Sequence, residues 1–151
     1  MTDRPFGCLL SGGIDSSIIT LLVNKIINSN SLRETKVNTF SIGLENSPDI
    51  IFAEKVALYL GTNHKTVIVT EQEMLDAIEP TIKQIESYDT TTLRASVPMY
   101  LLSKYIREQT DIKVILSGEG ADELSGSYLY FHRAPSSEEF QKECIRLIND
   151  V

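Results

Sequence analysis

The segment Ser11–Ser17, with the sequence Ser-Gly-Gly-Ile-Asp-Ser-Ser, is the part of this chain best suited to chemistry. It follows an apolar run and precedes a helix-forming stretch. Glycines let an anion approach the main chain, and the first N–H groups of a helix lack helical acceptors, so they can bind phosphate. Asp15 adds a carboxylate of the kind that binds magnesium beside a polyphosphate. The segment is therefore predicted to bind phosphate groups.

Other phosphate and nucleophile motifs do not fit this segment. Gly7 and Gly12 have the spacing of a Walker loop, but Gly13 stands where that loop requires its lysine. The glycine pattern of dinucleotide-binding folds and the Gly-x-Ser-x-Gly turn of hydrolases are both missing. A strand, turn and helix with one ordinary cap is the simpler alternative. One cap does not need the four polar residues and two glycines that these seven positions hold.

Two later segments carry related residues. The apolar run Lys113–Leu116 is followed by Ser117–Leu124, a turn of small residues crowded with carboxylates. Between the two turns lies Tyr88–Tyr100, which contains three consecutive threonines and then Arg94. Threonine runs are poor helix material, so this segment is expected to be a polar loop with a helix beginning near Pro98.

These segments together resemble the synthetase domain of glutamine-hydrolysing asparagine synthetases, which belong to the ATP pyrophosphatases. Members of that family carry a V-L-S-G-E-G-A/S-D-E turn, a Y-D-x-T-T-I-R-A-S-x-P-M-Y segment and an F-S-I-G-L strand. The matching stretches here are Ile115–Glu123, Tyr88–Tyr100 and Phe40–Leu44, in the family's order. The resemblance extends from about Arg4 to about Ala134. Ser125–Ser127 departs from the family's usual F-G-G.

The resemblance implies a set of site residues. Pyrophosphate would be held by Ser11, Gly12, Gly13, Asp15, Ser16 and Ser17, and magnesium by Asp15 and Asp122. The adenosine pocket would be lined by Leu9, Ile42, Ser117 and Gly118, of which Leu9 and Ile42 would be plain core residues in any sheet. Thr91, Thr92 and Arg94 would clamp phosphate oxygens, because a guanidinium binds phosphate through two parallel hydrogen bonds. Glu119 would hold aspartate or take a proton from ammonia.

The implied reaction is the ATP-dependent amidation of aspartate, through β-aspartyl-AMP, with release of AMP and pyrophosphate. Its cofactors would be ATP and Mg²⁺, and ammonia would come from glutamine hydrolysed in a separate glutaminase domain. Residues 1–151 would then be the N-terminal part of the synthetase domain, without the glutaminase domain and the C-terminal remainder, and inactive in isolation. Two alternatives stay open: another synthetase of the superfamily, such as a β-lactam-forming one, and a nucleotide-binding module without turnover.

Composition limits the partners. The formal net charge of −7 argues against a nucleic-acid partner, which needs a basic surface. No apolar run approaches the length of a membrane span, and no signal peptide is visible, so a cytoplasmic protein without a membrane partner is expected. Cys8 and Cys144 have no metal or disulfide spacing and are expected to be buried thiols. Homodimerisation is left open.

The order of apolar patterns predicts an α/β fold with a parallel sheet, helices on both faces and the Rossmann-like architecture of the ATP pyrophosphatases. In such a sheet both glycine turns would lie at the carboxyl ends of strands, and neighbouring first and last strands would bring Asp15 near Asp122. Ser47 and Pro48 are expected to begin the second helix, Gly61 to end it, and Pro80 to kink or split the third. Strands are predicted at 6–10, 37–44, 65–69 and 113–117, and helices at 15–27, 71–87, 98–109 and from Ser136 or Ser137 to about Asn149.

Overall fold

Four strands form one parallel sheet in the computed structural model, which describes residues 4–29 and 36–150. They are β1 (Phe6–Leu9), β2 (Asn38–Leu44), β3 (Asn63–Val69) and β4 (Val114–Leu116), in the spatial order β3-β2-β1-β4. Each predicted strand is present, with bounds that differ from the prediction by no more than two residues. The first and last strands are neighbours, with Gly7 opposite Ile115. The predicted fold class is confirmed.

The chain divides into two compact units, residues 1–117 and 118–151. The first contains the sheet and the helices α1 (Ile14–Ser29), α2 (Pro48–Leu60), α3 (Glu71–Asp76), α4 (Ile78–Ile85) and α5 (Thr90–Gln109). The second contains the helices α6 (Ala121–Ser125) and α7 (Ser137–Asp150), with the 3-10 turn η1 (Leu129–Arg133) between them.

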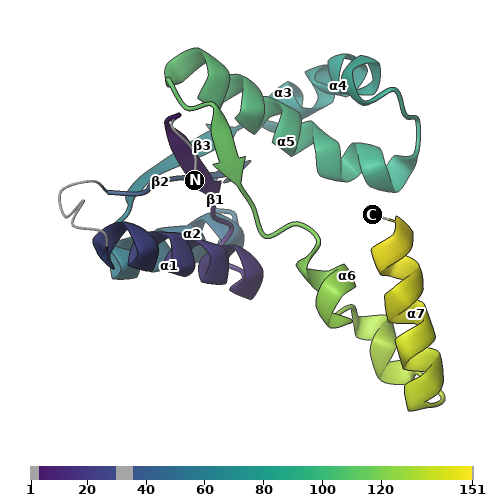
Figure 1. The fold of residues 1–151 in the computed structure, drawn as a ribbon. Coiled ribbons are helices and arrows are strands. Elements are labelled where there is room, and N and C mark those ends of the chain that lie inside the picture. The colour runs from purple at the N-terminus through teal and green to yellow at the C-terminus, as the bar shows by residue number, and fades with distance from the viewer. Residues whose placement is uncertain (1–3, 30–35, 151) are drawn as a thin grey trace. The chain divides into compact units, whose positions relative to one another are not determined.

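Helices cover both faces of the sheet, with α1 and α2 on one side and α5 on the other (Figure 1). On the α5 side, Phe40 packs with Leu102, Ile106 and Ile112. On the opposite side, Cys8 packs with Ile27 and Val37, while Leu10 packs with Ala53 and Ala57 of α2. The alternation of side chains along a strand sends neighbouring residues to these two separate cores.

The helix α1 has two adjacent apolar stripes, and it turns inward the one that contains Ile27. Ile27 is buried, but Ile18, Leu22 and Ile26 are about half exposed. Thr20 is fully buried instead. Its hydroxyl donates to the Ser16 carbonyl at 2.8 Å, so burial of this side chain leaves no polar group unpaired in the core. A pattern of apolar residues alone does not reveal such a self-satisfied threonine.

Proline and capping residues set the other helix ends. Pro48 is at the start of α2 after Ser47, and Gly61 ends it in the left-handed conformation, as predicted. The predicted third helix is split, and the break lies at Ala77, between α3 and α4. Pro80 explains that position, because a proline removes the hydrogen bond to the carbonyl four residues earlier and crowds it.

The start of α5 differs most from the sequence prediction. The helix begins at Thr90 and continues through Pro98, so the expectation of a polar loop before Pro98 was wrong. Asp89 makes the early start possible, because its side chain accepts hydrogen bonds from the Thr92 N–H at 2.7 Å and from the Thr92 hydroxyl at 2.8 Å. A good N-cap outweighs the weak helix propensity of three threonines.

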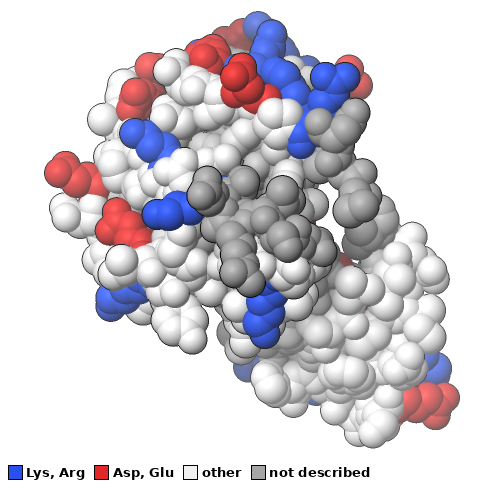
Figure 2. Space-filling model, turned by 60° about the vertical axis from the view of Figure 1, so that its left-hand side comes forward, with Lys and Arg blue, Asp and Glu red and all other residues white. Residues whose placement is uncertain are grey.

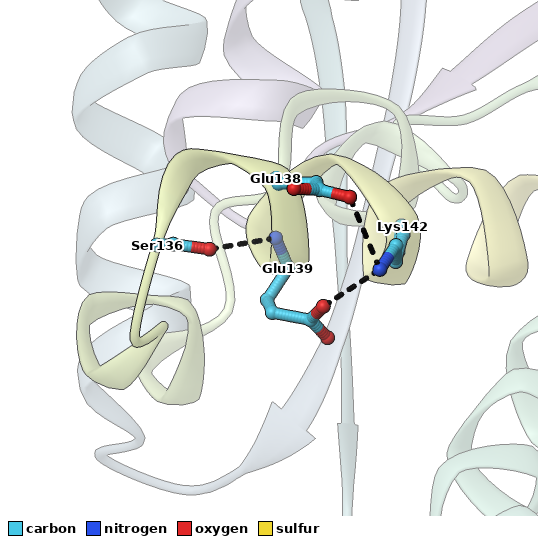
Figure 3. Close-up of polar contacts among 4 residues, drawn as sticks. All are labelled: Ser136, Glu138, Glu139 and Lys142. Atoms are coloured by element: carbon cyan, nitrogen blue, oxygen red, sulfur yellow. Dashed lines mark hydrogen bonds and ion pairs between the residues drawn. The ribbon is translucent and has the colours of Figure 1, made fainter.

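The second unit is a short helical hairpin. Ser136 caps α7 by accepting the Glu139 N–H at 3.2 Å, which confirms one of the two predicted caps, and Lys142 pairs with both Glu138 and Glu139 (Figure 3). Inside the hairpin, Phe131 lies edge-on to Phe140, and Cys144 is buried. Both cysteines are free and buried, as expected, and burial raises the pKa of the Cys8 thiol to about 11.

A histidine bridges two strands on the α2 face of the sheet. The His64 ring contacts the Thr39 hydroxyl through Nδ1 at 2.9 Å and the Ser41 hydroxyl through Nε2 at 3.0 Å. Thr39 also contacts the Thr62 hydroxyl at 2.9 Å. Burial lowers the pKa of His64 below 6.5, and the negative charge of Glu54 opposes that shift less strongly.

We expect acid to loosen this part of the sheet. Because the folded-state pKa is lowered, the contribution of His64 to stability is complete above its unfolded pKa of about 6.5 and is lost as the pH falls through the folded value. Hydrogen exchange of peptides from residues 38–69, corrected for intrinsic rates, should show weaker protection at pH 5.5 than at pH 7.5. His64→Gln should remove the difference and His132→Gln should keep it. An unchanged pH dependence in His64→Gln would contradict the assignment.

Candidate functional site

The loop between β1 and α1 lies at the carboxyl edge of the sheet. Leu10 follows the strand and donates its N–H to the Phe40 carbonyl at 2.8 Å, so the chain stays tied to β2 until the loop begins. The next three residues turn directly into α1. Ile14 and Asp15 occupy the first turn of that helix, where backbone N–H groups have no helical acceptor. The loop therefore presents backbone donors at the strand end, as the sequence predicted.

Three serine hydroxyls hold this loop in shape. The Ser16 Oγ accepts the Ser11 N–H at 3.2 Å, lies 3.0 Å from the Ser11 Oγ and donates to the Gly13 carbonyl at 3.2 Å. Ser17 donates to the same carbonyl at 2.6 Å. Ser16 is buried, whereas Ser11 is exposed. The hydroxyls thus have partners inside the loop, and their predicted contacts with pyrophosphate stay a prediction.

The two glycines of the loop meet different surroundings. Gly12 has a φ of 84°, and a Cβ there would lie 2.5 Å from the Phe52 carbonyl carbon and 2.6 Å from the Ala53 nitrogen. Gly12 therefore packs against the backbone of α2. A Cβ at Gly13 would meet only the Ser11 hydroxyl, at 3.4 Å, so the space beside Gly13 is open. Gly13 leaves room for an anion, and Gly12 leaves room for a helix.

The contact with α2 is the feature of the site that sequence reasoning missed. The prediction assigned both glycines to the approach of an anion. Ser47 and Pro48 predict the start of α2 correctly. The identities of Phe52 and Ala53, however, do not indicate that their backbone contacts Gly12. A backbone contact between segments forty residues apart leaves no local pattern in the sequence.

Asp15 is the acidic side chain of this loop. It is half-buried in the first turn of α1, where a carboxylate is favoured by the helix dipole. Within residues 4–29 and 36–150, no group of three His, Cys, Asp or Glu side chains gathers closely enough to hold a metal. Magnesium commonly uses one or two carboxylates together with substrate phosphates. Asp15 supplies one carboxylate, and the backbone N–H groups beside it suit the phosphates. The loop therefore fits that requirement.

The predicted adenosine contacts lie beside the loop. Leu9 ends β1 opposite Phe40, and Ile42 lies further along β2. Both are half-buried and pack against the Phe40 core. Their packing fits the plain core interpretation as well as a role in a nucleotide pocket, and that role stays a prediction.

The first turns of α5 carry the predicted anion clamp. Thr91, Thr92 and Arg94 are all exposed there. Arg94 borders an open apolar groove of about 590 Å³, which also touches Leu44 at the carboxyl end of β2. The fold therefore brings Arg94 to the same edge of the sheet as the glycine loop. Its contact with phosphate stays a prediction.

The second acidic turn belongs mostly to the second unit. Ser117 is half-buried at the end of the first unit, and Gly118 accepts the Ala121 N–H at 3.3 Å as the turn enters α6. Glu119 is exposed, and Asp122 is half-buried. The predicted meeting of Asp122 with Asp15 stays a prediction, as do the roles of Ser117, Gly118 and Glu119.

The departure of Ser125–Ser127 from the usual F-G-G has a structural account. Gly126 takes a φ of 62°, and a Cβ there would lie 2.8 Å from the Phe140 ring, so glycine is required at this position. Ser125 donates to the Ala121 carbonyl at 2.7 Å, and the Ser127 hydroxyl donates to the Asp122 carboxylate. The serines thus support α6 and orient Asp122.

Charged residues of both signs are scattered over the face of the molecule drawn in Figure 2. Figure 2 shows Lys and Arg interspersed with Asp and Glu on one face, without a continuous basic area there. Among the helices that the structure describes, none is both long and apolar enough to cross a membrane.

Comparison with known proteins identifies relatives over the whole chain. A family model described as asparagine synthase matches residues 1–149. The chain is 48% identical over 151 residues to the glutamine-hydrolysing asparagine synthetase of Gallus gallus. It is 49% identical to that of Mus musculus and 48% to that of Homo sapiens, each over 155 residues. These alignments cover 100% of this chain and 27% of each relative, so the chain spans about a quarter of their length.

Solved structures share the fold at low sequence identity. NMN synthetase from Francisella tularensis superposes with a TM-score of 0.50 and 18% identity, over 96% of this chain and 62% of that one. A protein described as a predicted subunit of tRNA methyltransferase from Methanocaldococcus jannaschii gives a TM-score of 0.51 and 19% identity, over 96% and 64%. At such identities the likeness concerns the fold alone.

Substitution of the two loop glycines should separate packing from binding. Gly12→Ala drives a Cβ into the backbone of α2 and should lower the free energy of unfolding by about 1–3 kcal/mol. Gly13→Ala should change it by less than about 0.5 kcal/mol, because the space there is open, yet it should weaken the binding of pyrophosphate. Urea unfolding and calorimetric titration with pyrophosphate measure the two effects. Equal losses of stability in both variants would contradict the packing role of Gly12.

Proposed function

The chain belongs to the asparagine synthase family, and from that membership we propose that the protein containing it converts aspartate into asparagine with ATP and with ammonia derived from glutamine. The single observation that carries the proposal on the structural side is the loop at Ser11–Ser17. It offers open space beside Gly13, backbone N–H groups without helical acceptors in the first turn of α1, and one carboxylate, Asp15. This combination suits the phosphate chain of a nucleotide.

The proposed reaction has two steps. In the first, an oxygen of the aspartate side-chain carboxylate attacks the α-phosphorus of ATP, and pyrophosphate leaves. In the second, the nitrogen of ammonia attacks the carbonyl carbon of β-aspartyl-AMP, a proton is lost from that nitrogen, and AMP leaves. The first step is needed because a carboxylate is a poor electrophile until one of its oxygens belongs to a good leaving group. Holding the reactants in place lowers the entropic part of both barriers.

The loop would hold the pyrophosphate portion. Backbone N–H groups at the start of α1 donate to its oxygens, and Gly13 lets it lie close to the main chain. The bonds of Ser16 to Ser11 and Gly13 keep the loop in one shape, so its donors need no rearrangement on binding. Asp15 and Asp122 would hold a magnesium ion, which supplies positive charge against the polyphosphate.

The remaining residues would act on the two substrates. Arg94 and Thr91 would donate to phosphate oxygens as negative charge shifts toward the leaving pyrophosphate, and Thr92 would join them once its hydroxyl turns from Asp89 to the phosphate. Their fixed place in α5 supports this role, since Asp89 anchors the first turn by accepting from Thr92. Leu9, Ile42, Ser117 and Gly118 would line the adenosine pocket. Glu119 would hold aspartate or accept the proton that ammonia loses.

The products distinguish this chemistry from that of a kinase. Turnover of the full-length protein with aspartate, glutamine and Mg-ATP should yield AMP and pyrophosphate in equal amounts with asparagine. The glycine at position 13, in place of a Walker lysine, motivates the expectation. Chromatography of the nucleotides checks it. Release of ADP as the sole nucleotide product would refute the proposed reaction.

Carboxylate substitutions test the assigned roles. Asp15→Asn and Asp122→Asn should each slow aspartate-dependent pyrophosphate release on the order of 10²-fold or more, because each removes a negative ligand that positions magnesium. Asp76→Asn, an exposed acid on α3, is the matched control and should leave the rate unchanged. Glu119→Gln should slow asparagine formation while ATP affinity stays near normal. Calorimetry that shows lost ATP binding in Glu119→Gln would exclude its assignment to aspartate or ammonia.

A further inference from the structure

A second cavity lies at the opposite edge of the sheet from the glycine loop. Its volume is about 520 Å³, and it touches Asn38 and Asn63, the first residues of β2 and β3. Because all four strands are parallel, their amino ends share one edge and their carboxyl ends the other. The cavity is thus separated from Gly13 and Asp15 by the length of the sheet, and the proposed function makes no use of it.

Three of the polar residues that line this cavity come from three different segments and can pair with a ligand. Lys65 comes from β3, Tyr105 from α5, and Asp111 from the connection between α5 and β4. None of the three makes a side-chain hydrogen bond or ion pair with another residue in the described part of the chain. The cavity is therefore lined by a cation, an anion and a phenolic hydroxyl, and all three are available to a ligand.

The floor and walls of the cavity are firmly built. Phe40 and Ile112 are both buried in the core under α5. The connection that carries Asp111 is fixed by Thr110, whose hydroxyl donates to the Ile106 carbonyl at 2.7 Å and accepts the Ile112 N–H at 3.2 Å. On the other wall, the Asn63 carboxamide donates to that of Asn38 at 2.6 Å. The hollow thus combines a rigid apolar floor with a neutral polar wall.

We propose that this cavity binds a free α-amino acid with an uncharged side chain. Its ammonium group pairs with the Asp111 carboxylate, its carboxylate accepts from the Lys65 ammonium and the Tyr105 hydroxyl, and its side chain lies over Phe40 and Ile112. A zwitterion pairs with both charges at once, and charge-assisted hydrogen bonds at both ends give the site its selectivity. The proposal stands apart from the proposed function, because it uses none of the residues at the carboxyl edge.

Binding of L-leucine to the full-length protein, followed by NMR titration, tests the proposal. L-leucine has no side-chain carboxylate, so it does not imitate aspartate. N-acetyl-L-leucine lacks the ammonium charge, and L-leucine amide lacks the carboxylate. Each analogue should bind at least about tenfold more weakly than L-leucine, which is the effect expected when one charged hydrogen bond is lost. Equal binding of L-leucine and either analogue, or no binding of L-leucine, would overturn the proposal.

Substitutions locate the bound amino acid. Lys65→Gln and Asp111→Asn should each weaken L-leucine binding about tenfold, and Tyr105→Phe should weaken it less. Both charged residues are exposed, so these changes should not disturb folding, which circular dichroism checks. Lys25→Gln and Asp76→Asn are controls of the same kinds outside the cavity and should have no effect. Asp15→Asn should also leave L-leucine affinity unchanged. Loss of affinity in Asp15→Asn but not in Lys65→Gln or Asp111→Asn would place the amino acid at the other edge and refute this site.

Discussion

The approach of Gly12 to the backbone of α2 is the constraint on which the rest of the first unit depends. With no side chain at this position, α2 can lie directly on the loop. The same helix packs Ala53 and Ala57 against Leu10, so small residues bring helix, strand and loop together. Interiors are packed too tightly to yield to an added methyl group at such a point. The shape of the loop and the position of α2 therefore depend on the same contact.

A second set of contacts links the end of α2 to strands β2 and β3. Thr62, just beyond α2, donates its N–H to the Ala57 carbonyl at 3.1 Å, and its hydroxyl meets Thr39, which in turn contacts His64. Thr39 is buried and the other two are half-buried, and all three have partners within the network, so they fix the helix on the sheet without the cost of unpaired donors. The carboxyl edge is left to loops and helix starts, where the first backbone N–H groups have no helical acceptor.

Local sequence accounts for much of the fold and part of the site. Glycines, prolines and caps act within a few residues, so Ser47, Gly61 and Ser136 were identified correctly, and Pro80 predicted a split whose exact place is Ala77. The start of α5 was mistaken because the weak propensity of three threonines was weighed without the strength of the Asp89 cap. Apolar periodicity does not reveal that Thr20 faces inward, because a threonine that bonds to its own helix can be buried like an apolar residue.

The sequence by itself determined the family, the parallel α/β fold and the place of the glycine loop between the first strand and the first helix, because motif spacing and strand periodicity are local properties of the chain. Only the tertiary structure decided that Gly12 serves the packing of α2, that Ser16 faces into the loop, and that Lys65, Tyr105 and Asp111 line one cavity. Each of these facts depends on contacts between segments far apart in the chain. Such contacts are fixed by the packing of helices on a sheet, and no single segment encodes them.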